Sequence, residues 1–184
     1  EQALQTADFI IAQHIRDDYP LEFVRNGFLT GNYPGKVVFW PNHFFDGYAP
    51  EMAYIHDPEG RRHVLPGPLG DVHLRSVIYA YQNNFSREQA TSFLNDDEFF
   101  RGNFSGVAER SLNELKSRES MCSVTIADHV EDTFRHRRQF FTFNHPRTSV
   151  LYETATRLAR YLGQPTGPYL GDYLFEEDLS VVIA

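Results

Sequence analysis

The stretch VVFWPNHFFDGYAP, residues 37–50, joins an apolar run to a dense polar turn. The apolar run ends at Trp40. Five polar or turn-forming residues then share the next seven positions after the proline: Asn42, His43, Asp46, Gly47 and Tyr48. A second stretch, FFTFNHPRTS at residues 140–149, has the same form, because its aromatic run ends at Asn144 and His145. Both stretches indicate a buried strand that carries polar side chains to its carboxyl end.

The composition is that of an ordinary globular protein, and it limits the classes of function. The chain has 184 residues, 41% hydrophobic and 23% charged, which suits one domain with a sizeable core. A net charge of −8 argues against general nucleic-acid binding, because neutralising phosphates needs a basic face. No apolar stretch approaches the ~20 residues of a membrane span, and the first residues lack the features of a signal peptide. The single cysteine, Cys122, excludes a disulfide within the chain and suits a reducing compartment, so we expect a cytoplasmic protein.

The first half of the chain has the signals of strands followed by helices. Continuous apolar runs at residues 7–14 and 36–40 indicate buried strands, which suit a parallel sheet covered on both faces. Residues 71–83 fit a helix. Ser86 and Gln89 form a capping box that opens another helix, because the hydroxyl and the amide can each satisfy a free backbone donor.

The second half is predicted to be mostly helical. Residues 95–106 break the pattern, and Ser105 is then the expected N-cap of an apolar stripe that runs to about Arg138 on one helix or two successive helices. A further helix follows the second polar turn and stops at Gly163. The fold class predicted for residues 1–184 is therefore α/β: a helix-rich single domain with a small, mainly parallel sheet.

Polar side chains at the strand ends are the candidates for chemistry. In open α/β sheets, ligands bind outside the carboxyl ends of the strands, so parallel strands would bring three clusters to one edge. The clusters are Gln13 and His14; Asn42, His43 and Asp46; and Asn144 and His145. His145 is the strongest candidate, because imidazole exchanges protons near neutral pH and the following proline restrains the backbone. Asn42 and Asp46 have an equally simple interpretation as turn residues.

Three other features have alternative interpretations. A metal site could form from His14, His43 and His145 with Asp46, but their spacing is not diagnostic of zinc. Cys122 lies on the apolar stripe, where a free cysteine usually behaves as a small buried hydrophobe. The basic run RHRR, residues 135–138, either complements a helix C-terminus or holds the phosphates of a nucleotide or of coenzyme A.

Several segments, taken in order, resemble a known family. ADFIIAQHIRDDY, KVVFWPNHFFDGYAPEM, SREQA and FFTFNHPRTSVLYETATRLARYLG are similar to the WcbI-type polysaccharide biosynthesis proteins, over about residues 7–163. The family is regarded as coenzyme A-dependent acetyltransferases that act on a capsular sugar. Its members open with a strand and a G-N-C-Q-like turn that supplies a cysteine nucleophile. This motif is absent here. We expect a strand-turn-helix that carries it to lie upstream of this chain; the alternative is a protein without the nucleophile, in which acyl transfer would not pass through a cysteine.

The resemblance implies roles for the candidate residues. The phosphates of acetyl-CoA would lie near Arg135, Arg137 and Arg138, and Gln13, His14 and His43 would also contact the coenzyme. His145 would be the general base, and the catalytic set would include Asn144, Asn42 and Asp46, with Asn42, Asn144 or Gln13 donating to the oxyanion.

The implied reaction is O-acetylation of a sugar or nucleotide-sugar in capsular or surface polysaccharide biosynthesis. Two alternatives remain open. One is an SGNH-like esterase of acylated glycans, which would use the same site with water as the acceptor. The other is a non-catalytic glycan- or nucleotide-binding module.

Overall fold

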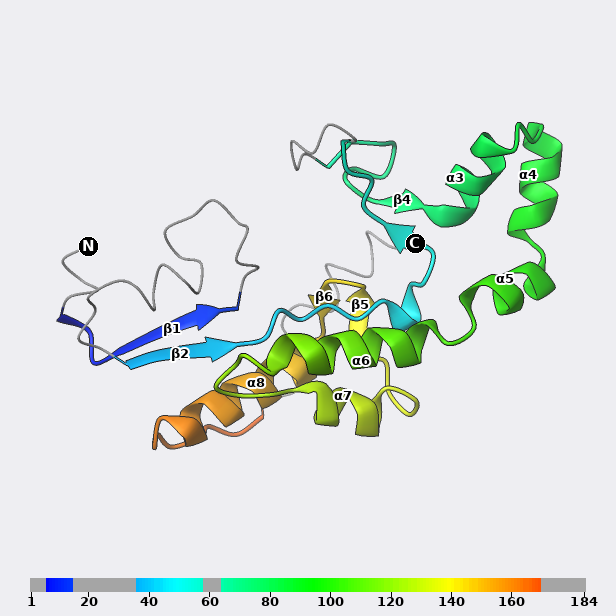
Figure 1. The fold of residues 1–184 in the computed structure, drawn as a ribbon. Helices are drawn as coiled ribbons and strands as arrows, with labels where there is room; N and C mark the ends of the chain where they lie inside the picture. Colours follow the sequence, from blue (N-terminus) through cyan, green and yellow to red (C-terminus); the bar gives the residue numbers. More distant parts are fainter. Residues whose placement is uncertain (1–5, 15–35, 58–63, 170–184) are drawn as a thin grey trace.

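The computed structural model describes residues 6–14, 36–57 and 64–169, shown in Figure 1. Three short two-stranded sheets are combined with six longer segments of helix and one 3-10 turn. The strands are β1 (Phe9–Gln13), β2 (Lys36–Trp40), β3 (Met52–Ala53), β4 (His73–Leu74), β5 (Phe140–Thr142) and β6 (His145–Pro146). The helices are η1 (Asp46–Tyr48), α3 (Arg75–Gln82), α4 (Arg87–Leu94), α5 (Asp97–Phe104), α6 (Val107–Glu119), α7 (Ala127–Thr133) and α8 (Thr148–Tyr161). The predicted α/β class, rich in helix, is confirmed.

The longest ladder is the predicted parallel pair. β1 and β2 run parallel, with Gln13 opposite Trp40 at the carboxyl end. Ile10 and Phe39 are buried from the two strands and form a small apolar cluster. The backbone N–H of His14 donates to Trp40 O at 2.7 Å, which extends the pairing one residue beyond β1. The first two polar clusters therefore leave the same edge of this sheet, as predicted.

The third extended segment does not join that sheet. β5 pairs antiparallel with β6, so the stretch around residues 140–146 folds back on itself as a tight hairpin. β3 and β4 form a second antiparallel pair. The prediction of a third parallel strand was wrong, because the polar pair Asn144-His145 turns the chain directly back and leaves no room for a crossover.

The main core surrounds Phe45, which is fully buried in the loop that follows β2. α6, α7, α8 and β5 each direct apolar side chains to it, among them Leu112, Leu115, Ile126, Ala127, Val130, Phe140 and Val150. The predicted apolar stripe is thus divided between two successive helices. Glu119 makes this break possible, because its Oε2 accepts from Ile126 N at 2.8 Å and Ala127 N at 3.0 Å, the free donors at the start of α7.

One helix was missed between the capping box and α6. Residues 97–104 form α5, because the Asp96 carboxylate accepts from Glu98 N and Phe99 N and so caps its N-terminus. Ser105 was wrongly predicted as an N-cap: it follows α5, and α6 begins after Gly106, which has the left-handed φ of +73°. The capping box of Ser86 and Gln89 is confirmed, with both hydrogen bonds formed.

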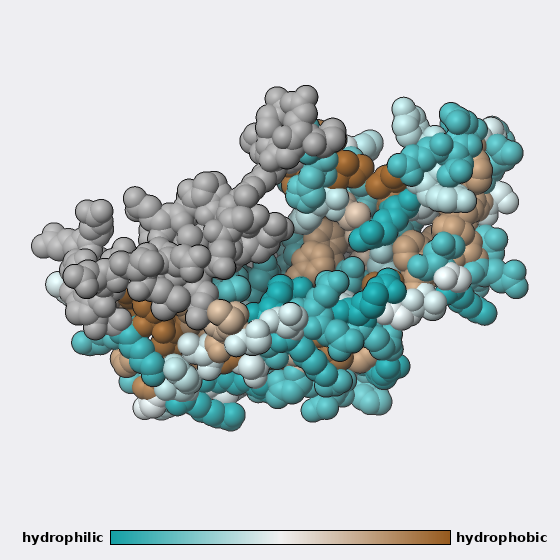
Figure 2. Space-filling view, viewed as in Figure 1, coloured by the Kyte–Doolittle hydropathy of each residue, from teal (hydrophilic) through white to brown (hydrophobic). Residues whose placement is uncertain are grey.

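Helices α3, α4 and α5, residues 75–104, form an arm that projects from the rest of the molecule, here called the body (Figure 1). Aromatic rings from the three helices contact one another, namely Tyr79, Phe85, Phe93, Phe99, Phe100 and Phe104. Neither α4 nor α5 contains a buried residue. In Figure 2, hydrophobic side chains accordingly show along the arm and in the recess between arm and body. Within the described residues, no helix has the length and apolar character needed to cross a membrane.

Candidate functional site

The second and third polar clusters meet through the loop that follows β2. The backbone N–H of Phe45 donates to Phe143 O at 2.7 Å, and the rings of Phe44 and Phe143 are 5.0 Å apart. This contact brings the loop after β2 against the hairpin that carries Asn144 and His145. The convergence of the polar side chains of the two clusters stays a prediction.

His145 is held by a hydrogen-bonded chain of three other polar side chains. Its Nδ1 bonds Thr142 Oγ1, Thr142 Oγ1 donates to Asn144 Oδ1 at 3.0 Å, and Asn144 Nδ2 donates to the Tyr54 hydroxyl at 2.8 Å. A hydroxyl has a single proton to donate. With the Asn144 amide in this orientation, Thr142 therefore accepts from Nδ1–H of His145. The Nε2 lone pair of the exposed imidazole is then left available to take a proton.

Tyr54 closes this chain at the end away from His145. Its ring packs edge-on against Phe143, with ring centroids 5.0 Å apart, which fixes the hydroxyl beneath the hairpin. Burial, with a smaller contribution from the charge of Asp71, raises the pKa of Tyr54 above its usual value, so the phenol stays protonated. Tyr54 was not predicted as part of the site, because 90 residues separate it from Asn144 and no local pattern connects them. Thr142 was not predicted either, although it lies in the aromatic run just before Asn144.

His43 has a different environment from His145. It is 4% exposed, its Nε2 lies 2.9 Å from Thr154 Oγ1, and its ring contacts Trp40. Thr154 Oγ1 donates to Val150 O, so it accepts from Nε2–H of the histidine. Burial lowers the pKa of His43 to about 4, and the ring is neutral at pH 7. Any contact of His43 with a coenzyme would thus rely on hydrogen bonding or packing, without a positive charge.

The remaining strand-end residues have separate environments. Asn42 is exposed, and its carbonyl accepts from Phe44 N at 3.0 Å, which is the turn role considered above. Gln13 and His14 lie at the end of β1, and the His14 ring packs against Phe39. The Asp46 backbone N–H donates to Ser111 Oγ at 3.0 Å, which places this residue against α6, away from the His145 chain.

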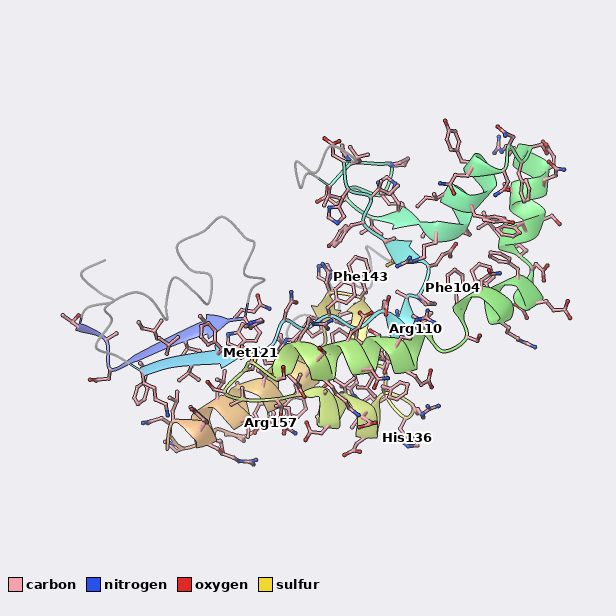
Figure 3. All side chains as sticks on the ribbon, viewed as in Figure 1. Phe104, Arg110, Met121, His136, Phe143 and Arg157 are labelled. Carbon is pink, nitrogen blue, oxygen red and sulfur yellow. The ribbon has the colours of Figure 1, made fainter. Side chains whose placement is uncertain are left out.

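The basic turn at residues 135–138 is not part of this cluster. Figure 3 shows His136 at the far end of α7, on the opposite side of α6 from Phe143. Arg135 pairs with Glu109 at 2.9 Å, and Arg138 donates to Phe140 O and Phe141 O. The Tyr48 hydroxyl anchors this turn through contacts with Phe134 O, Arg137 O and Gln139 N. The role of these arginines in binding phosphate stays a prediction.

The metal and cysteine interpretations can also be compared with the structure. No group of three or more His, Cys, Asp or Glu side chains that could hold a metal ion occurs in the described part of the chain. Cys122 packs against the small apolar cluster of Ile10 and Phe39, so it behaves as a hydrophobe. Cys122 lies in the turn after α6, although the sequence predicted that it would lie within a helix.

This is an α/β protein in which a histidine, oriented by a hydrogen-bonded chain, lies on a hairpin that contacts the loop after a parallel strand pair. The family model of the polysaccharide biosynthesis enzyme WcbI matches residues 1–167, so the chain belongs to the WcbI family. The resemblance seen in the sequence is confirmed.

The fold is similar to a solved structure of WcbI, with a TM-score of 0.71 and 21% sequence identity. That structure is described as a novel polysaccharide biosynthesis enzyme in its native form, without a disulfide bond between coenzyme A and one of its cysteines. The match covers 89% of this chain and 54% of that one, so the chain spans about half the length of the solved protein. No curated protein matches the chain.

Proposed function

We propose that the chain carries the acid–base part of a coenzyme A-dependent O-acetyltransferase that modifies a sugar in surface polysaccharide biosynthesis. The observation that carries this proposal is the chain His145–Thr142–Asn144–Tyr54, which orients the imidazole and leaves one of its nitrogens available. Membership of a family of polysaccharide biosynthesis enzymes supports the sugar substrate. The association of coenzyme A with the similar structure supports the acyl donor.

His145 is proposed as the general base. Acetyl-CoA, when bound, supplies an acetyl group activated as a thioester. Nε2 of His145 takes the proton of the sugar hydroxyl as its oxygen attacks, and the imidazolium then gives this proton to the departing thiolate. Thr142 and Asn144 hold the ring and stabilise its positive charge. Asn144 Nδ2 uses one of its two N–H donors on Tyr54, so Asn144, Asn42 and Gln13 all remain candidates to donate to the oxyanion.

The exposed arginines of residues 135–138 remain the proposed phosphate contacts. A guanidinium has five N–H donors, and Arg138 uses two of its side-chain nitrogens on backbone carbonyls. Arg135 would exchange its surface partner Glu109 for a phosphate at small cost, because an exposed ion pair contributes little. These groups would hold the anionic end of the coenzyme away from the hairpin.

A calorimetric titration with coenzyme A, repeated with acetyl-CoA, tests the donor. We expect binding that weakens when Arg135, Arg137 and Arg138 are changed together to glutamine. Folded protein that binds neither compound, but releases acetate from an acetylated glycan, would instead show the hydrolase. Protein that binds glycan or nucleotide with no turnover would show a binding module.

Variants of the hairpin test the base. His145→Ala should lower kcat by about 10²–10⁴-fold while coenzyme A binding is kept. Thr142→Val removes the hydroxyl at nearly constant shape and should lower kcat by about 10–100-fold, whereas Thr142→Ser should restore it. Full activity of His145→Ala, or equal activity of the valine and serine variants, would contradict the assignment.

A further inference from the structure

A cavity of about 260 Å³ lies between the arm and the body, away from the His145 chain. The body contributes Asp46, Arg110 and Glu114 to its lining, and the arm contributes Arg75, Asn103 and Phe104. Figure 3 shows Phe104 and Arg110 close together where α5 leads into α6. The cavity therefore combines four charged groups, an amide and an aromatic ring from three separate segments of the chain.

The charged groups of this cavity do not neutralise one another by direct contact. Among the residues that the structure describes, the side chains of Asp46, Arg75 and Arg110 make no hydrogen bond and no ion pair within 4.0 Å. The positive charge of Arg118, which is not part of the lining, acts on both Glu114 and Asp46, and its guanidinium lies 4.0 Å from the Glu114 carboxylate. Carboxylates and guanidinium groups thus line the same cavity without forming ion pairs with one another.

The balance of charge indicates which chemistry the cavity suits. Two guanidinium groups face two carboxylates, so a phosphate or carboxylate ligand would meet repulsion from Asp46 and Glu114 as well as attraction. A neutral polyhydroxyl compound avoids this conflict, because its hydroxyls can donate to the carboxylates and accept from Arg75 and Arg110. Asn103 can do both. Such convergent polar groups beside an apolar surface are typical of sites for small molecules.

Phe104 supplies the apolar surface. Its ring is half-buried and also lines a neighbouring cavity, largely apolar, that shares Pro50 with the first. A pyranose ring has an apolar C–H face and polar edges. The Phe104 ring can contact the C–H face of a pyranose, and the charged groups of the cavity can contact its hydroxyls.

The position of Asp46 is rigidly set. Its backbone N–H is bonded to the buried Ser111, and a Cβ added at Gly47 would lie 2.4 Å from the Phe45 ring and 3.0 Å from Ala108. The turn therefore has room only for glycine at this position. Phe45, the residue before Asp46, bonds Phe143 of the hairpin, so one wall of the cavity is connected directly to the element that carries His145.

We propose that this cavity is a subsite for a neutral sugar residue of the polysaccharide acceptor. Its assignment to the acceptor rests on the proposed transferase function, whereas the binding of sugar itself does not. The hydroxyls of the sugar would contact Asp46, Arg75 and Arg110, and its C–H face would lie on Phe104.

Saturation-transfer NMR with the methyl glycosides of mannose, galactose, glucose and N-acetylglucosamine tests this subsite on the whole chain. We expect transfer to the ring protons of at least one glycoside. Arg110→Gln and Asp46→Asn should each weaken it by about tenfold or more, because each removes a hydrogen bond to a charged group. Arg160→Gln, an exposed arginine in the last turn of α8, is the matched control and should change nothing.

The outcomes separate this subsite from the proposed function. Coenzyme A binding without any glycoside binding would overturn the subsite and leave the transferase in place. Glycoside binding without coenzyme A binding would support the subsite and remove the transferase. Displacement of the glycoside by inorganic phosphate, unchanged binding in both variants, or loss of coenzyme A affinity in Arg110→Gln would each overturn the assignment to a neutral sugar.

Discussion

The body and the arm of this protein are built in opposite ways. The body places seven buried residues around Phe45, and six of them have an exposed fraction of 0%, as Phe45 itself has. The arm has no buried residue in α4 or α5, and its aromatic rings stay partly accessible while they contact one another. The body is thus stabilised by complete removal of apolar surface from water, and the arm by ring contacts and helix caps.

This difference indicates what each region can tolerate. In a close-packed core, a substitution that changes side-chain volume destabilises the protein. In a half-exposed cluster, neighbouring side chains can move to accommodate such a change. The proposed sugar subsite lies where the two regions meet, and its arm-side residues can change at little cost in stability. The chain that holds His145 belongs instead to the body.

Phe45→Ala should destabilise the protein by about 3–5 kcal/mol, because it empties the centre of the main core. Phe93→Ala, its counterpart in the arm, should cost about 1–2 kcal/mol, since the ring is only partly buried. Urea denaturation followed by circular dichroism measures both. Equal losses would show that the arm is packed as tightly as the body.

His43 should make the body sensitive to acid. Its pKa is 6.5 in the unfolded chain and about 4 in the folded protein. The unfolded state therefore binds the proton first, so stability is complete above pH 6.5 and falls as the pH decreases toward 4. The total loss is about 3 kcal/mol. His43→Gln can still donate to Thr154 but cannot titrate, so its free energy of unfolding should vary less between pH 7 and 4.5. The same acid loss in this variant would exclude His43 as the cause.

Glu119→Ala should destabilise the protein by about 2 kcal/mol. The substitution leaves two backbone N–H groups at the start of α7 without their acceptor. Glu109→Ala, on the same helix, breaks only the exposed pair with Arg135 and should cost less than about 1 kcal/mol. Thermal unfolding of the two variants provides the comparison, and equal shifts in Tm would argue against the capping role.

Ser86→Ala should have the smallest effect, about 1 kcal/mol, because it removes one half of the capping box. The loss should be confined to the arm. We expect faster amide hydrogen exchange in α4 with unchanged exchange in α6. Faster exchange in both helices would show that arm and body unfold as one unit.

Local signals in the sequence predicted a large part of the fold. The parallel strands follow from continuous apolar runs, the capping box from Ser86 and Gln89, and the end of α8 from Gly163, which has a φ of +68°. Each signal acts within a few residues. The helix α5 was missed because its cap, Asp96, lies in a stretch of Asn, Asp and Gly that also suits a loop.

The candidate site was predictable only in part, for the same reason. His145 and Asn144 could be singled out by their place at the end of an aromatic run. Their partner Tyr54 could not, nor could the direction of the hairpin, since both depend on which segments meet in space. The buried state of His43 was also hidden, because its neighbour Thr154 lies 111 residues away in α8.

Short-range periodicity, residue type and motif order were sufficient to predict most of the strands and helices, the candidate polar residues and the resemblance to the family. The packing of distant segments, in contrast, sets which histidine is buried and neutral and which is oriented by a hydrogen-bonded chain. It also decided that arginines and carboxylates from the arm and the body line one cavity. Burial and hydrogen bonding between distant segments set the properties of a titratable group, and these arise only when the chain has packed.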